Sequence, residues 1–143
     1  PYYIVQNADS GAIPPHAVKK AIFCLDAHQE SFRKAVKAGV KIAAGTDAGT
    51  PFNLHGDFAK ELELMHECGM PIRDIITSAT YQAASALNVQ DQTGSLEKGK
   101  VADFIVLSED PEDNISAFRS VDAVYKGGTL VHGHSNRESV YTK

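Results

Sequence analysis

The first third of the chain contains two short apolar runs separated by a long segment of helical periodicity. The run Tyr2–Gln6 is rich in aromatic and β-branched residues, which predicts a buried strand. From Pro14-Pro15 to Ala38-Gly39, apolar residues recur every three or four positions, which predicts one long helix. The second run, Val40–Gly45, is apolar except at Lys41, as in strands covered on both faces. The pattern therefore predicts strand, helix, strand: one βαβ unit.

Two further helices and three short strands are predicted in the rest of the chain. Asp57–Glu67 and the segment from Pro71 to Leu87 both carry apolar residues at helical spacing. Past residue 93 this spacing disappears, and strand-like runs are found at Val101–Leu107, Val121–Lys126 and Thr129–His132. The last two runs flank Gly127-Gly128, which is a two-residue hairpin signal.

These patterns divide the chain into two parts. Residues 1–93 are predicted to be α/β with the character of a parallel sheet, and residues 94–143 to be short antiparallel strands and a tail. Two parallel strands alone make a poor sheet, and a complete (β/α)8 barrel takes about 200 residues or more. We therefore expect residues 1–93 to be the end of a larger sheet or barrel. The first residue is Pro1 rather than Met, which also suggests a piece of a longer polypeptide.

Composition and charge argue against two classes of partner. Of the 143 residues, 43% are hydrophobic and 22% are charged, as in an ordinary globular protein. The net charge is −4 and Lys and Arg do not cluster, so we expect no nucleic-acid partner. No apolar run reaches the roughly 18 residues that span a bilayer, so we expect no membrane partner. The sequence does not distinguish a cytoplasmic from a periplasmic location.

One carboxylate lies where chemistry is possible. Asp47 follows the second apolar run, in the segment "VKIAAGTDAGTPFNLHG". Gly45 and Gly49 allow the backbone to turn sharply on either side of it. Asp is also common in such turns because its side chain hydrogen-bonds nearby backbone. Spacing alone leaves a turn-forming role and a metal-binding role open, and it favours the turn.

Four segments in a fixed order favour the metal-binding role instead. They are "AGVKIAAGTDAGTP", "ELELMHECGMPIRDIITSATYQAASALNV", "GSLEKGKVADFIVL" and "DPEDNI...VDAVYKGGTLV". Together they resemble the C-terminal portion of the metal-dependent amidohydrolase superfamily. The nearest subgroup is imidazolonepropionase-like, and it includes Xaa-Pro dipeptidases and zinc carboxypeptidases. The resemblance is firmest from Ala38 to Val131.

The resemblance implies a fold: the C-terminal part of a distorted (β/α)8 barrel, with strands of a small β-sandwich. Tyr2–Gln6 would be the seventh barrel strand and Lys41–Thr46 the eighth. Asp47 would then stand at the C-terminal mouth of the barrel, where barrel enzymes hold their active sites. Residues 94–143 would supply strands of the sandwich and the tail.

The resemblance also implies roles for single residues. Asp47 would bind the metal and accept a proton from the attacking water. His55 would either line the substrate pocket or cap the helix that begins at Asp57, and Thr50 is a further candidate for substrate contact. The expected cofactor is a divalent metal, zinc as one or two ions. The family's other ligands are absent from this sequence, and a zinc site needs about three protein ligands, so we expect the chain alone to be inactive. The pair His132 and His134 has metal-ligand spacing but falls on the sandwich side, where we expect no site.

The resulting hypothesis is a portion of a metal-dependent amidohydrolase that cleaves C–N bonds of amide or peptide-like substrates. Two alternatives stay open: a stand-alone, non-catalytic α/β binding module, and part of a cyclic-amide hydrolase of the imidazolonepropionase type. The expected partners are a small-molecule or dipeptide-like substrate and the N-terminal remainder of the same protein. We also expect a homo-oligomer, because strands at Tyr2–Val5 and Val40–Ala44 would expose apolar edges.

Overall fold

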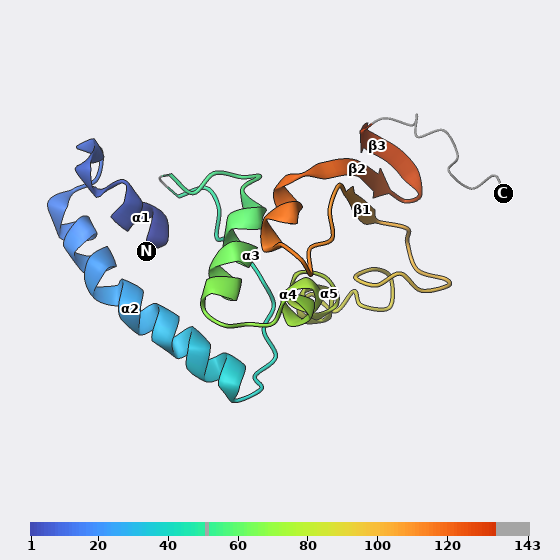
Figure 1. The fold of residues 1–143 in the computed structure, drawn as a ribbon, viewed down its shortest axis with the longest axis horizontal. Helices are drawn as coiled ribbons and strands as arrows, with labels where there is room; N and C mark the ends of the chain where they lie inside the picture. The colour runs from blue at the N-terminus through green and yellow to red at the C-terminus, as the bar shows by residue number, and fades with distance from the viewer. Residues whose placement is uncertain (51, 134–143) are drawn as a thin grey trace.

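The computed structural model describes residues 1–50 and 52–133, which form helices over one part of the molecule and a small sheet at the other end (Figure 1). The helices are α1 (Tyr2–Gln6), η1 (Ala8–Ser10), α2 (Pro15–Lys37), α3 (Phe58–Glu67), α4 (Ile72–Ala79), α5 (Tyr81–Ala86) and η2 (Ile115–Arg119). The strands are β1 (Phe104–Leu107), β2 (Val121–Lys126) and β3 (Thr129–Gly133). Helices α1 and α2 make an arm on the side opposite the sheet, and α3 to α5 lie between them (Figure 1).

The long helix predicted after Pro14-Pro15 is confirmed as α2. It begins with Pro15, whose fixed φ suits a first helical turn, and it runs for 23 residues. It ends at Lys37 with Ala38 as its C-cap, and Gly39 follows with φ 68°, the left-handed conformation that glycine adopts without steric cost. The predicted helix at 57–67 is also confirmed, as α3.

The strand predicted at Tyr2–Gln6 is wrong, because these residues form helix α1. A strand can satisfy its backbone only by pairing with a neighbour, and no described segment pairs with this one. The helix instead satisfies the backbone internally, for example through Val5 N donating to Pro1 O at 3.1 Å. Helix α1 packs against α2.

The strand predicted at Val40–Gly45 does not form a ladder, so the predicted βαβ unit is absent from the described residues. Ala44 N donates to Ser78 O at 3.0 Å, but no other strand lies beside the segment. Burial nevertheless alternates with a period of two along residues 41–47. Ile42 and Ala44 pack into the core, while Ala43 and Asp47 face away from it and are exposed.

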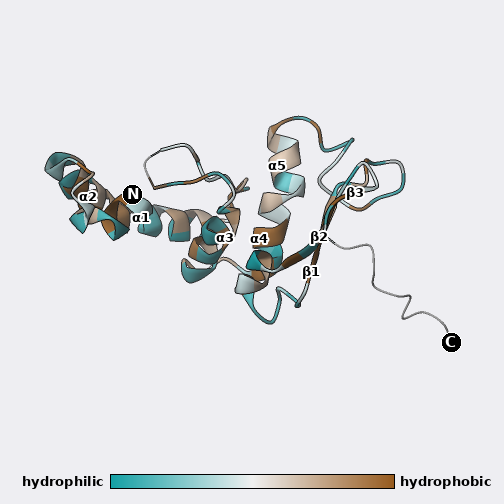
Figure 2. Cartoon of the chain, turned by 90° about the horizontal axis from the view of Figure 1, so that it is seen from above, coloured by the Kyte–Doolittle hydropathy of each residue, from teal (hydrophilic) through white to brown (hydrophobic). Residues whose placement is uncertain are grey.

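The core lies between α2, α3 and α4. Its buried centre consists of Leu62, Met65, Met70 and Ile75, with Ile75 fully buried at 0% exposure. Phe32 and Val36 of α2 pack on it from one side, and η2 contributes Ile115 and Phe118 from the other. Figure 2 shows the hydrophobic positions on α4 and along β1 and β2.

The single helix predicted from Pro71 to Leu87 is instead two helices, α4 and α5, which break at Thr80. Near the break, three side-chain hydroxyls each donate to a backbone carbonyl three or four residues earlier. They belong to Thr77, Ser78 and Thr80. Such bonds compete with the helix ladder and bend it. Gly94 then packs on α5, where an added Cβ would lie 2.6 Å from Ala84 Cβ, so only glycine fits there.

The hairpin predicted at Gly127-Gly128 is confirmed. These two residues have φ of 56° and 77°, and positive φ at both central positions is the mark of a type I′ turn. The sheet is antiparallel with strand order β1-β2-β3, and its first strand starts at Phe104 rather than at Val101. The rings of Phe104 and Tyr125 stack across β1 and β2 with their centroids 4.5 Å apart. Among the described helices, none is long and apolar enough to cross a membrane.

Truncating the centre of this core is expected to destabilise the chain strongly. Ile75→Ala removes buried methylenes at a site with 0% exposure and should lower the free energy of unfolding by about 2–5 kcal/mol. Leu96→Ala, at a position that is 77% exposed, is the matched control and should change it by less than about 0.5 kcal/mol. Urea unfolding followed by circular dichroism measures both. Equal effects of the two substitutions would contradict the position assigned to the core.

Candidate functional site

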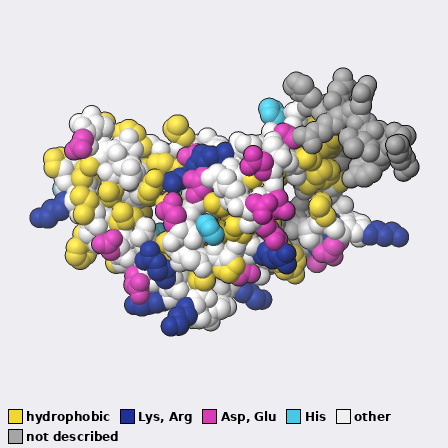
Figure 3. Space-filling model, viewed as in Figure 1, with side chains coloured by type: hydrophobic (Ala, Val, Ile, Leu, Met, Phe, Trp, Pro, Cys, Tyr) yellow, Lys and Arg dark blue, Asp and Glu magenta, His cyan; other side chains and the backbone are white. Residues whose placement is uncertain are grey.

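A cleft of about 330 Å³ opens between helices α1, α2 and α3 and the segment that follows residue 44. Its apolar wall includes Leu25, Phe32 and Met65, and its polar lining includes Tyr3, Asp47 and Glu61. Figure 3 shows hydrophobic side chains gathered over the α1–α2 end of one face and charged side chains of both signs over its centre. A cleft with an apolar wall and a few polar groups is the usual form of a small-molecule site.

Asp47 stands at the start of the loop that joins residue 46 to α3. Its φ is 50°, a left-handed conformation that Asp tolerates better than most residues. Asn53 fixes this turn, because its Nδ2 donates to Thr46 O at 2.6 Å and to Asp47 O at 3.1 Å. Within the described residues the Asp47 carboxylate has no hydrogen bond or ion pair, so it is free to accept a ligand.

The structure brings two of the three predicted site residues to the cleft. Thr50 lines it together with Asp47, and its carbonyl accepts a hydrogen bond from Asn53 N at 3.0 Å. His55 is exposed and is not among the residues that line the cleft. It lies next to Gly49, where an added Cβ would be 3.4 Å from His55 Nε2. The imidazole is therefore on the loop but beside the cleft.

Sequence reasoning missed a second carboxyl group in the cleft. Glu61 lies on the face of α3 that lines the cleft, and burial raises its pKa. His28, from α2, also lines the cleft and acts in the opposite direction on the pKa of Glu61. The signal for Glu61 was its place in an amphipathic helix, which by itself suggested only a solvated side chain.

Sequence reasoning also missed a polar network at one end of the cleft. Tyr3 Oη donates to Asp57 Oδ2 at 2.7 Å, and Arg119 Nη1 donates to Asp57 Oδ1 at 3.0 Å. Arg119 also donates two hydrogen bonds to the Glu63 carboxylate, from Nε to Oε1 at 2.5 Å and from Nη2 to Oε2 at 3.0 Å. Lys60 Nζ lies 3.3 Å from Glu63 Oε2 and 5.0 Å from the ring centroid of Tyr2. The network joins α1, α3 and η2.

These contacts shift the pKa values of Asp57, Glu63 and Tyr3. The hydrogen bond from Tyr3, and then that from Arg119, lower the pKa of Asp57. Arg119 likewise lowers the pKa of Glu63. Burial and the bond to Asp57 raise the pKa of Tyr3 to about 12, so its hydroxyl stays protonated and remains a donor at neutral pH.

A metal site needs several ligating side chains gathered at one place. No group of three or more His, Cys, Asp or Glu side chains among residues 1–50 and 52–133 is placed to hold a metal ion. Asp47 offers one suitable oxygen ligand for a divalent cation, whereas a closed zinc site needs about three protein ligands or more. His132 lies exposed in β3, far along the chain, and its predicted partner His134 falls outside the described residues. These residues alone therefore do not make a metal centre.

Acid is expected to weaken the network. Asp57 and Glu63 have lowered pKa values when folded, so they stabilise the fold above the ordinary carboxyl pKa of about 4 and lose that effect as pH falls through the lowered values. Asp57→Asn should therefore lower the melting temperature at pH 7 but have little effect near about pH 2. Thermal unfolding at both pH values measures this, with the exposed Asp26→Asn as control. An Asp57→Asn effect that is independent of pH would contradict the assignment.

A model of the amidohydrolase family matches residues 3–131 of the chain. Among curated proteins, ochratoxinase of Aspergillus niger is 39% identical over 114 residues, which covers 76% of this chain and 23% of ochratoxinase. Imidazolonepropionase of Fusobacterium nucleatum is 32% identical over 120 residues, covering 76% of this chain and 27% of that protein. The chain thus spans about a quarter of the length of these relatives.

A solved structure gives the same result at the level of the fold. The crystal structure of a Xaa-Pro dipeptidase with methionine bound in its active site superimposes with a TM-score of 0.83 and 39% sequence identity. The match covers 92% of this chain and 32% of the dipeptidase chain. Since the family model extends over most of the sequence and the fold agrees with it, the chain belongs to the amidohydrolase family.

Proposed function

We propose that the chain is part of a metal-dependent enzyme that hydrolyses C–N bonds in small amide or peptide-like substrates, with Asp47 as its catalytic carboxylate. The observation that carries this proposal is the state of Asp47. It lines the cleft, its backbone is pinned by Asn53, and its carboxylate has no partner among the described residues. A carboxylate used only to form a turn would bond to the turn itself.

In the proposed mechanism, Asp47 binds and orients the attacking water and accepts its proton on a carboxylate oxygen. It then gives that proton to the leaving nitrogen, which departs as a neutral amine. Asn53 keeps the carboxylate in place by holding the carbonyls of residues 46 and 47. Thr50 in the cleft and His55 beside it are proposed to contact the substrate.

A divalent cation would complete this site in the whole protein. When bound, it would lower the pKa of the attacking water and polarise the substrate carbonyl. Asp47 would be one of its ligands, and the remaining donors would come from outside the described residues. We propose zinc, as one or two ions, and we therefore propose that the chain by itself does not turn over substrate.

The proposed setting is the end of a (β/α)8 barrel in residues 1–93, followed by strands of a small sandwich in residues 94–143. The period-two burial of residues 41–47 supports a role as a barrel strand, because one face packs on helices and the other is open. Asp47 would then be at the carboxyl end of that strand. Strands β1 to β3 would join the sandwich.

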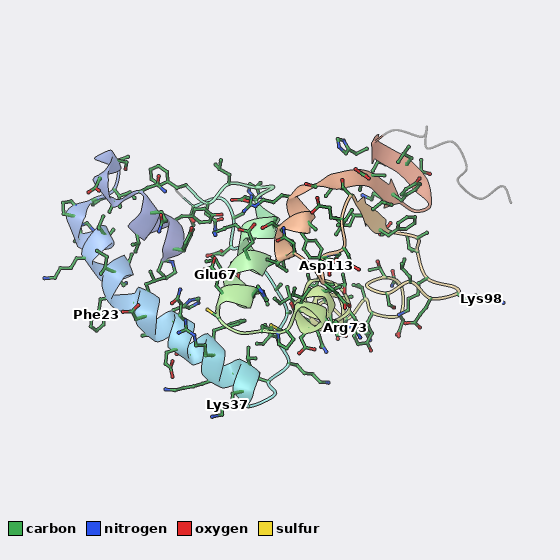
Figure 4. The ribbon with its side chains drawn as sticks, in the orientation of Figure 1. Phe23, Lys37, Glu67, Arg73, Lys98 and Asp113 are labelled. Carbon is green, nitrogen blue, oxygen red and sulfur yellow. The ribbon has the colours of Figure 1, made fainter. Side chains whose placement is uncertain are left out.

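The similarity to imidazolonepropionase and Xaa-Pro dipeptidase supports two substrate classes, cyclic amides and dipeptides. We favour peptide-like amides, because the dipeptidase match has the higher identity and covers more of this chain. We also propose two protein partners, namely the rest of the same polypeptide and further copies of the protein. Exposed apolar residues on α2, with Phe23 83% and Ile22 55% exposed, support association between copies (Figure 4).

Removing the charge of Asp47 tests the catalytic role. In the full-length protein, Asp47→Asn should lower kcat by about 10²- to 10⁴-fold, the usual contribution of a general base. The matched control is Asp26→Asn, an exposed position on α2 that is not among the residues lining the cleft, which should leave kcat unchanged. Circular dichroism should show that both variants fold. An Asp47→Asn enzyme that retains most of its activity would refute this role, whereas a wild-type protein with no hydrolytic activity would favour a non-catalytic binding module.

Metal removal and substrate choice test the rest of the proposal. Dialysis of the full-length protein against a chelator should abolish hydrolysis, and added zinc should restore it, because the cation activates the water. Parallel assays with dipeptides and with cyclic amides, followed by release of free amine, then identify the class. Full activity in the metal-free protein would contradict the metal dependence, and turnover of cyclic amides alone would replace the peptide-like substrate.

A further inference from the structure

The loop from Asp47 to Asp57, here called the Asp47 loop, is held at both ends by hydrogen bonds, and different side chains make them at each end. Asn53 holds the beginning, through hydrogen bonds to the carbonyls of residues 46 and 47. Asp57 holds the end, immediately before α3. Asp57 occupies the N-cap position of α3, yet its side chain makes no capping hydrogen bond. Its two oxygens bond instead to Tyr3 and to Arg119.

Arg119 is the centre of this second anchor. It is the last residue of η2, whose start is fixed by Asn114 Oδ1 accepting from Ser116 N at 3.0 Å. All three guanidinium nitrogens donate, two to Glu63 and one to Asp57. The planar fork of arginine suits such an arrangement, and the point charge of lysine cannot reproduce it.

Removing Arg119 would affect its two carboxylate partners differently. Glu63 would keep Lys60, whose Nζ lies 3.3 Å from it. Asp57 would lose the ion pair that the structure gives it and would keep only the weaker influence of Lys60, whose charge also lowers the pKa of Asp57. Its remaining hydrogen bond, from Tyr3, comes from a residue that lines the cleft. A displaced Asp57 would therefore move both the loop end and one wall of the cleft.

We infer that Arg119 is a positioning residue for the active-site cleft: through Asp57 it sets the end of the Asp47 loop and the orientation of Tyr3. The part of the chain that carries the small sheet thereby acts on the cleft without contacting the substrate. This inference rests on the proposed function for its effect on catalysis, but its structural part does not depend on it.

The chain offers a matched control. Arg73, on α4 (Figure 4), makes the same two-pronged contact with Glu112, from Nε at 2.7 Å and from Nη2 at 3.0 Å. Arg73 and Glu112 do not line the cleft. Arg73→Gln and Arg119→Gln therefore each remove a two-pronged contact with a glutamate, once away from the cleft and more exposed, and once beside the cleft.

The experiment compares these variants in the full-length protein by hydrogen–deuterium exchange and steady-state kinetics. Arg119→Gln should speed exchange at the amides of residues 48–50 and 52–56 by roughly tenfold, as expected when a charge-assisted hydrogen bond at the loop end is lost. It should also lower kcat by up to about 10²-fold, because a small misplacement of catalytic groups is costly. Arg73→Gln should change neither. Arg119→Lys should give only partial recovery.

Tyr3→Phe serves if Arg119→Gln fails to fold. It removes only the hydroxyl that bonds to Asp57, and it should raise exchange in the same residues, while Tyr81→Phe, on α5 and outside the cleft lining, should not. Exchange in the Arg119 or Tyr3 variants that equals the controls would overturn the inference. If the wild-type protein hydrolyses none of the tested amides, the proposed function fails, but the exchange comparison still decides whether Arg119 positions the loop.

Discussion

The packing of Ile42 and Ala44 into the helical core is the interaction on which the rest of the site depends. These two side chains lie against the cluster centred on Ile75, so the path of residues 41–47 is set by burial and not by strand pairing. Apolar burial of this kind is the largest favourable term available to a short segment. Fixing Ile42 and Ala44 against the core sets where the segment ends, and Asp47 stands exposed at that end, where it lines the cleft.

The loop beyond Asp47 depends on polar contacts of a different strength. The side chains of Arg119 and Asp57 are 45% and 36% exposed, and exposed ion pairs usually contribute little to stability. Such pairs instead fix geometry, because the planar guanidinium of Arg119 holds the Asp57 carboxylate in one orientation. Buried apolar contacts can thus set where the segment runs, while the polar network sets how the loop end and Tyr3 are oriented.

What could be predicted from the sequence was what depends on near neighbours. Helices α2 and α3 and the hairpin at Gly127-Gly128 follow from spacing and turn chemistry within a few residues. The strands at 2–6 and 40–45 were wrong or unpaired because a strand needs a partner, and the pattern cannot say whether one is present. The break at Thr80 depends on hydroxyl hydrogen bonds, and Arg119 finds its partners 56 and 62 positions away. Local periodicity carries no information about either.

One side of residues 41–47 is exposed, and Asp47 has no companion metal ligands among the described residues. Ala43 and Gly45 face this side, and side chains this small let another backbone approach closely. Helices already pack on the opposite side, so neighbouring barrel strands that bring further donors to Asp47 would lie on the open side. Neighbouring strands of a barrel would satisfy the unpaired backbone of this segment and deliver their own side chains to its carboxyl end. In the proposed fold, the same neighbouring strands would supply two things that residues 41–47 lack among the described residues: a hydrogen-bonded strand partner and further metal ligands beside Asp47.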